Sequence, residues 1–330
     1  MKKDKTVKTL EEIRELQKTT RTARRMAALA TVCWALIGST YGLHLLMQAG
    51  GLSENYVFVI IFFALLTAGV VSYIKTPKQF YREYKTYLVN SAADGLFDEY
   101  QYFPDGCFDR EVLEETNLLD LEGKKFESND FFEGTYQGVR FARADIEIYN
   151  DLPGKFKKQY FGNWNVFSFS KASPRKIWIS TRKLFTHSRL RTEYIQFSNN
   201  GENGITTGDD YFDSLFFCGC EDEQAARELL TPQLMKILCG FYNKNGYPFI
   251  VAWVDGRLHV IVEDKKDTVH PSVTMDVNPV LEIEKAREDL KFVCDIVDEL
   301  VIGDKVFSEY AMYGQAVDSE PVIGKGLRRQ

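Results

Sequence analysis

The chain has 330 residues, 45% of them hydrophobic and 27% charged, so it can bury a core and is not an intrinsically disordered protein. Residues 1–27 carry nine Lys/Arg and four acidic residues, whereas the whole chain has a net charge of −6. The acidic remainder argues against nucleic acid as a partner, and the basic head suits a surface of anionic lipid. Six irregularly spaced cysteines exclude a disulfide scaffold and predict reduced thiols in a cytoplasmic compartment.

Two uncharged stretches near the N-terminus predict transmembrane helices. Residues 26–47 and 56–74 contain no Asp, Glu, Lys or Arg. Both are long enough to cross a hydrocarbon core about 30 Å thick. The short external loop 48–55 between them requires an antiparallel hairpin. A secretory signal is the alternative for the first stretch, and a buried soluble helix pair is the alternative for both. The length and close succession of the apolar runs favour membrane spans.

The basic residues predict the orientation of this hairpin. They precede the first span and follow the second, at Lys75, Lys78, Arg82 and Lys85, whereas the connecting loop has none. The positive-inside rule therefore places residues 1–25 and 75–330 in the cytoplasm. We expect a multi-pass protein of the cell membrane with both termini cytoplasmic, whose spans have the lipid bilayer as their partner.

Two features inside the first span have competing interpretations. Gly38 and Gly42 have the small-xxx-small spacing that lets helices approach closely. Packing within the hairpin is favoured over homodimerisation, because the second helix is tethered nearby. His44 lies one turn from the end of the span, where a position near the water interface is favoured over a proton relay.

Further helices are predicted on both sides of the spans. Residues 1–25 form a basic cytoplasmic region whose part 8–25 reads as a helix continuing into the first span. Pro77 is predicted to start a juxtamembrane connector helix over 75–94, and a short helix is expected at Asp109–Leu119.

Alternating apolar residues then predict β-strands. Two strands flank a turn at Gln137-Gly138, and Asn199–Asp210 reads as a loop rich in Gly, Asn, Thr and Asp. The predicted strands are Phe131–Gln137, Val139–Tyr149, Asn165–Ser170, Lys176–Ser180, Glu193–Phe197 and Tyr211–Cys220.

The C-terminal third predicts helices and one hairpin. Asp222–Leu230 has helical composition, and Thr231 and Pro232 are predicted to cap and start a second helix that Gly246 closes. Asp255-Gly256 is a strong signal for a tight hairpin turn. The hairpin strands are Tyr247–Val254 and Arg257–Glu263, a long helix is expected at 280–302, and the last dozen residues read as a tail. Residues 95–330 are therefore expected to form one cytoplasmic α+β domain, an antiparallel β-sheet with packed helices.

The stretch Tyr211–Met235 resembles a bacterial membrane-protein family called domain of unknown function 3137. Asp130–Phe141 and Trp164–Phe169 are also similar to this family, as is the arrangement of two spans before the domain. The resemblance implies a bacterial inner-membrane protein and no particular activity. The matching residues of the first stretch are Phe212, Phe216, Ala226, Arg227, Leu230, Thr231, Pro232, Leu234 and Met235.

Cys218-Gly219-Cys220 is the strongest candidate for metal or redox chemistry. On a strand, the two thiols would face the same side about 7 Å apart. A zinc site needs a second pair of ligands, and Cys239 and His259 lack the required spacing. Core packing of the two cysteines is therefore favoured, and neither a metal nor a cofactor is predicted.

Other chemistry-bearing residues form no recognisable motif. The histidines are isolated, and nucleophile-elbow, P-loop and dinucleotide-binding signatures are absent from the sequence. The basic stretch Arg175–Arg191 could contact phosphates, but a charged edge of the sheet is the favoured interpretation. The four histidines are His44, His187, His259 and His270.

No catalytic, cofactor-binding or metal-binding residue is therefore assigned. The expected function is a non-enzymatic, membrane-anchored module whose cytoplasmic domain binds a protein partner or ligand. Two alternatives remain open: an enzyme at the membrane surface with an unrecognised active site, and a lipid-facing domain that uses the Arg175–Arg191 surface.

Overall fold

The computed structural model divides the chain into two units, which are described separately. The helical unit consists of Met1–Ser91 with Val269–Ile283, and the sheet unit consists of Ala92–Thr268 with Glu284–Gln330. The residues that the structure describes are 8–47, 56–114, 116, 118–119, 121, 123–152, 155–168, 177–182, 203–220, 222–254, 257–264, 273 and 278–298.

Two helices of 38 residues each dominate the helical unit: α1, Leu10–Met47, and α2, Tyr56–Ala93. The prediction that the helix before the first apolar stretch continues into it is confirmed. The prediction that Pro77 starts a separate helix is wrong, because Pro77 lies inside α2. Pro77 removes one backbone donor, and the loss of this single hydrogen bond does not end the helix, which runs on to Ala93.

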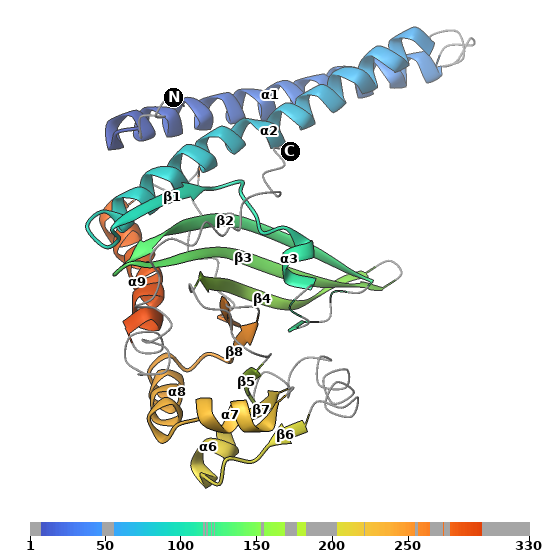
Figure 1. Cartoon of the computed structure of the whole chain (residues 1–330). Helices are drawn as coiled ribbons and strands as arrows, with labels where there is room; N and C mark the ends of the chain where they lie inside the picture. Colours follow the sequence, from blue (N-terminus) through green and yellow to red (C-terminus); the bar gives the residue numbers. More distant parts are fainter. Residues whose placement is uncertain are drawn as a thin grey trace. The chain divides into compact units, whose positions relative to one another are not determined.

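α1 and α2 run side by side in opposite directions (Figure 1). Gly38 of α1 lies under the Phe62 ring, since a Cβ there would meet Phe62 Cε2 at 1.8 Å. Gly69 of α2 in turn faces Thr31, whose Oγ1 would lie 2.4 Å from an added Cβ. The two contacts lie seven residues apart on each helix, and each helix supplies the glycine of one of them, where the small residue allows close approach.

The ends of the two helices beyond the apolar stretches share a small core. Its buried members come from α1, from α2 and from the later segment that belongs to this unit, and Tyr84 donates a hydrogen bond to Glu282 at the start of α9 (Pro279–Ile296). The buried residues are Ile13, Phe80, Tyr84, Leu88 and Val273.

The sheet unit is built on one antiparallel sheet of nine strands in the order β1-β2-β3-β4-β9-β8-β5-β7-β6 (Figure 1). The mixed α/antiparallel-β architecture predicted from the sequence is confirmed. The strands are β1 Glu99–Phe103, β2 Lys124–Tyr136, β3 Val139–Leu152, β4 Lys155–Ser168, β5 Ile177–Thr181, β6 Asn203–Ile205, β7 Phe216–Cys220, β8 Phe249–Val254 and β9 Arg257–Val262.

The predicted turn between β2 and β3 is confirmed. Gln137 and Gly138 have φ of 48° and 78°, and Tyr136 pairs with Val139 across them. Two successive positive φ values give a tight turn whose geometry matches the right-handed twist of the flanking strands. Asp130 also has a positive φ, 56°, where the register shifts between Asn129 and Phe132, which marks a bulge in β2.

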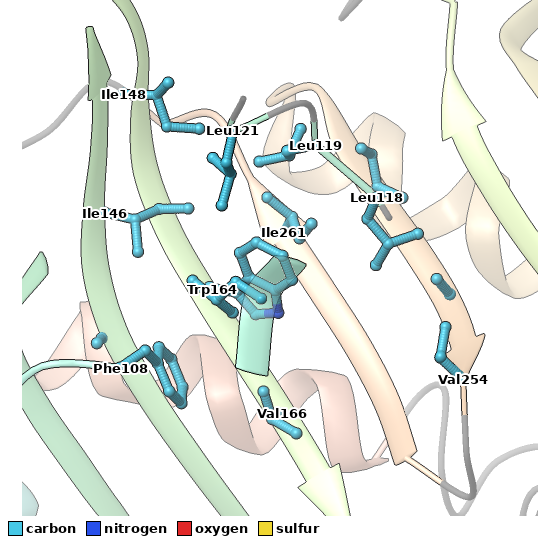
Figure 2. Close-up of a cluster of buried hydrophobic side chains, with 14 of the residues drawn as sticks. Phe108, Leu118, Leu119, Leu121, Ile146, Ile148, Trp164, Val166, Val254 and Ile261 are labelled. Atoms are coloured by element: carbon cyan, nitrogen blue, oxygen red, sulfur yellow. The ribbon is translucent and has the colours of Figure 1, made fainter. Parts of the chain in front are cut away.

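One face of the sheet buries a cluster of apolar side chains around Trp164 (Figure 2). β3 contributes Ile146 and Ile148, and β9 contributes Ile261. The segment that includes α3, Arg110–Glu114, adds Phe108 and leucines that cover this face. α3 is shorter than the helix predicted over 109–119.

Two predictions for residues 199–220 are wrong. Residues 211–215, expected to be part of the strand Tyr211–Cys220, belong to helix α6, Asp210–Leu215. The Asp209 carboxylate accepts a hydrogen bond from the Phe212 backbone at 3.0 Å, so a local N-cap overrides the strand-like composition. The expected loop also contains the short strand β6, which pairs with β7.

The remaining helices and the last hairpin are confirmed. α7 spans Glu223–Leu229, and α8 spans Pro232–Asn245. β8 and β9 pair up to Val254 and Arg257. α9 spans Pro279–Ile296 and therefore covers most of the helix predicted over 280–302. The predictions for 48–55, Glu193–Phe197, Asp255-Gly256 and the tail lie outside the described residues.

Candidate functional site

The most distinctive surface of the helical unit is the outer side of the α1/α2 pair. Large apolar side chains point outward on both helices; for example, Leu36 is 61% and Ile60 is 64% exposed. Both helices are long and apolar enough to cross a membrane. A core helix of a soluble protein would bury such side chains, whereas here only 6% and 0% of the most apolar 18-residue stretches of the two helices are buried.

The surroundings of Gly38 and Gly42 differ. Gly38 is occupied by Phe62 of the same chain, whereas nothing lies within 4 Å of a Cβ at Gly42. The close approach at Gly38 is therefore contact within the helix pair. His44 lies near the end of α1, as the sequence indicated.

A polar cluster lies on the face of the sheet opposite Trp164. Arg143 of β3 is 4% exposed and binds Asp289 of α9 twice, donating to the carboxylate at 2.6 Å and to the backbone carbonyl at 2.9 Å. Burial lowers the pKa of Arg143, but the nearby Asp289 and Asp145 carboxylates raise it by more than burial lowers it. The net shift of the pKa is therefore upward. The pair ties this part of α9 to the sheet.

Cross-strand neighbours extend this cluster. Arg143 pairs with Asn165 of β4, and Asp145 pairs with Asn163. Asn165 Nδ2 donates to Asn163 Oδ1 at 2.6 Å, and Asn163 Nδ2 donates to the Asp264 carboxylate at 2.9 Å. Buried Asn165 retains an Oδ1 that accepts no hydrogen bond from the described residues.

Asp145 is the most perturbed acid of the cluster. Burial raises its pKa well above the usual range; Arg143 opposes this, and other nearby aspartates add to it. Sequence reasoning missed this cluster. The available signal was a strand in which Arg143 and Asp145 occupy alternate positions following Phe141, which places two charges on a face that also carries a buried aromatic ring.

Cys218 and Cys220 lie on β7 and are each 2% exposed. Burial raises the pKa of Cys218 to about 12, so its thiol is protonated at neutral pH. Between them, Gly219 leaves room for Trp178, since a Cβ there would lie 2.0 Å from Trp178 Cζ2. The motif therefore has a packing explanation, and the described residues contain no group of three potential metal ligands.

His259 is buried beside Trp164, whose Nε1 donates to His259 Nδ1 at 3.1 Å. Burial, aided by Arg257, lowers the pKa of His259 to about 3, so it is neutral at physiological pH. His187 and His270 lie outside the described residues. His259 thus completes the apolar face instead of forming a reactive centre.

The residues of the family-like stretch have structural roles. Thr231 caps α8 by accepting a hydrogen bond from the Leu234 backbone at 3.1 Å, and Gly246 ends the helix with φ of 70°. Arg227 is exposed and pairs with Glu223 of its own helix at 2.7 Å. A shallow pocket on the surface of α7 is lined by Glu223, Gln224, Arg227 and Glu228.

The expectation that Arg175–Arg191 forms a charged edge is wrong for its described part. β5 lies between β8 and β7, and all five of its residues are buried. A continuous apolar run, Ile177–Ile179, is typical of a central strand. Arg182 follows β5 on the surface, and its Nε donates to the Asp213 carbonyl at 2.7 Å.

The family model described as "Protein of unknown function (DUF3137)" matches residues 158–301. The predicted resemblance is confirmed. The DUF3137 match includes Tyr211–Met235 and runs from β4 past α9, whereas Asp130–Phe141 lies before it. No activity accompanies the family description.

A comparison with solved structures found similarity to "crystal structure of the mycobacterial trehalose monomycolate transport factor A, TtfA". The two chains are 10% identical, the similarity covers 63% of this chain and 95% of that chain, and the TM-score is 0.31. A TM-score this low supports no argument about fold or function. A comparison with curated proteins found no match.

Proposed function

We propose that the chain is a multi-pass membrane protein of the bacterial inner membrane, with spans at 26–47 and 56–74 and both termini in the cytoplasm. The observation that carries this proposal is the outward apolar surface of α1 and α2. In water this surface would be exposed, and at about 25 cal/mol per Å² of apolar area it would favour association or insertion strongly. A bilayer would cover the outward apolar side chains of both spans.

The orientation rests on charge. The basic residues at the outer ends of both predicted spans face one compartment, and the connecting segment carries none. Fusion of a compartment-sensitive reporter after Gln330 should show the cytoplasmic pattern, and the same reporter placed after Gly51 should show the opposite one. Identical readings at both sites would refute the two-span topology, and reversed readings would refute its orientation.

The sheet unit is proposed to be a binding or scaffold module without enzymatic activity. Two chemical observations support this part. The Cys218 thiol is held protonated by burial, and His259 is enclosed between apolar neighbours, so neither can act as a nucleophile or base at neutral pH.

Affinity purification of the full chain in mild detergent tests the binding role, with residues 1–94 as the control bait. A protein or ligand that co-purifies with the full chain and not with the control is bound by the region after the spans. Turnover of a substrate by the purified full chain would contradict the non-enzymatic part.

A further inference from the structure

Arg24 and Tyr73 form a cation–π stack where both helices leave their apolar stretches. The Arg24 guanidinium carbon lies 4.3 Å from the centroid of the Tyr73 ring. Arg24 is two residues before the predicted span 26–47, and Tyr73 is the penultimate residue of the span 56–74. The stack therefore marks the same boundary on α1 and α2, and it fixes the plane of a guanidinium there.

The stacked guanidinium has unused hydrogen-bonding capacity. Arg24 Nε is buried and has no hydrogen-bond partner among the described residues. No described carboxylate forms an ion pair with Arg24, in contrast to Arg143. A guanidinium offers five N–H donors in a planar fork, a shape that matches two oxygens of a phosphate. The buried Nε is out of reach of an external oxygen, so the terminal N–H groups of the guanidinium are the donors for such a ligand.

Charge at this boundary has one sign. Residues 16–27 and 57–82 contain no Asp or Glu. Arg25 follows Arg24 in the sequence and Lys75 lies two residues after Tyr73, and both side chains are exposed. Lys78, one turn further along α2, is exposed as well. Several fixed positive charges at one level attract a negatively charged group and add to its binding at low ionic strength.

The apolar surface begins directly beside these charges. Met26 is 62% and Ile74 is 58% exposed, one on each helix. A ligand with a phosphate at Arg24 and acyl chains below it would cover both side chains, which free phosphate cannot do. The juxtaposition of an open guanidinium, excess positive charge and exposed apolar side chains fits a phospholipid with a net negative headgroup.

We propose that Arg24, held in place by Tyr73, binds the phosphate of an anionic phospholipid at the cytoplasmic boundary of the helix pair. This inference rests on the proposed membrane insertion. Arg24 supplies paired hydrogen bonds, Tyr73 positions it, and Lys78 adds charge. The site gives the helix pair a preference for anionic over zwitterionic lipid.

The test uses the full chain purified in a mild detergent and native mass spectrometry with dioctanoyl phosphatidylglycerol, dioctanoyl phosphatidylcholine or inorganic phosphate. Phosphatidylglycerol should bind most tightly, and Arg24→Gln should weaken its binding roughly tenfold, as expected for a lost charge-assisted contact. Tyr73→Leu keeps an apolar residue and the charge of Arg24 but removes the stacking ring, so it should also weaken binding. Arg14→Gln, an exposed change on the same helix, is the matched control and should leave binding unchanged.

Equal binding of phosphatidylglycerol by the wild type and Arg24→Gln would overturn the inference, and so would equal weakening by Arg14→Gln. Inorganic phosphate bound as tightly as phosphatidylglycerol would show that acyl chains do not contribute. Alkaline carbonate extraction of membranes separates this outcome from failure of the anchor. Release of the chain by carbonate refutes the membrane insertion itself, whereas a retained chain without an effect of Arg24→Gln refutes the lipid site alone.

Discussion

Removing the two partners of the Arg143–Asp289 pair should have unequal effects on the free energy of unfolding. Arg143 is almost fully buried, whereas the Asp289 side chain is 22% exposed. Asp289→Ala removes the hydrogen-bonded carboxylate and leaves the buried guanidinium with the backbone carbonyl of residue 289 as its hydrogen-bond acceptor among the described residues, which should cost about 3–5 kcal/mol. Arg143→Met removes the buried charge and leaves the Asp289 carboxylate, which water can reach. Asp145 also loses its cation, but its pKa is already raised by burial, so it can take up a proton. The variant should therefore cost less, about 1–3 kcal/mol.

The double variant sharpens this prediction. Arg143→Met combined with Asp289→Leu removes both charges and replaces them with apolar volume, so its loss should be smaller than the sum of the single losses and close to the wild type within about 1–2 kcal/mol. Lys244–Asp295, a solvent-accessible ion pair between α8 and α9, provides the matched control. Asp295→Ala should change stability by only about 0–1 kcal/mol.

Urea unfolding of the full chain in detergent, followed by tryptophan fluorescence, measures these differences. Three of the four tryptophans, Trp164, Trp178 and Trp253, lie in strands of the sheet unit, so the signal reports mainly on the sheet. The reasoning is refuted if Arg143→Met costs more than Asp289→Ala, or if Asp289→Ala costs no more than Asp295→Ala.

Two further predictions concern the packed face and its histidine. Gly219→Ala should destabilise the protein by about 1–3 kcal/mol because its Cβ would meet Trp178, whereas Gly240→Ala, in α8 with open space around it, should stabilise by up to about 1 kcal/mol; thermal unfolding compares them, and equal effects would refute the packing explanation. Because the pKa of His259 is lowered to about 3, the unfolded chain binds a proton that the folded chain does not, so stability should fall as pH decreases below about 6.5. Between pH 7 and 5, His259→Gln should flatten this fall in unfolding free energy, and an unchanged slope would show that other groups cause it.

The sequence was sufficient for the parts of the fold that local signals determine. The hairpin at Gln137-Gly138 has two positions that accept positive φ, and α8 has a capping threonine, an N1 proline and a terminal glycine. These signals act over a few residues, so one sequence contains all the information needed. The same locality explains the error at residues 211–215, where the aromatic spacing is typical of a strand but the N-cap at Asp209 starts a helix.

β5 shows that a local sequence pattern can identify a strand without predicting its position in the sheet. Its residues were identified as a strand, but whether a strand is central or at an edge depends on partners far away in the sequence. β5 pairs with β7 on one side and with β8 on the other. Flanking Arg and Lys residues suggested an edge, although the uninterrupted apolar run Ile177–Ile179 already indicated burial on both faces.

The polar cluster around Arg143 could not be predicted from the sequence because its two main partners are distant in the chain. Arg143 and Asp289 are 146 residues apart, and neither lies in a motif that anticipates the other. A strand can carry an arginine toward solvent or toward a covering helix, and only the position of α9 distinguishes the two. Once α9 covers this face, the charge needs a carboxylate, and Asp289, which lies between the buried residues Ala286 and Leu290, supplies one. The pairing is thus a consequence of the tertiary fold, which is why its energetics test the structure more directly than any local cap or turn.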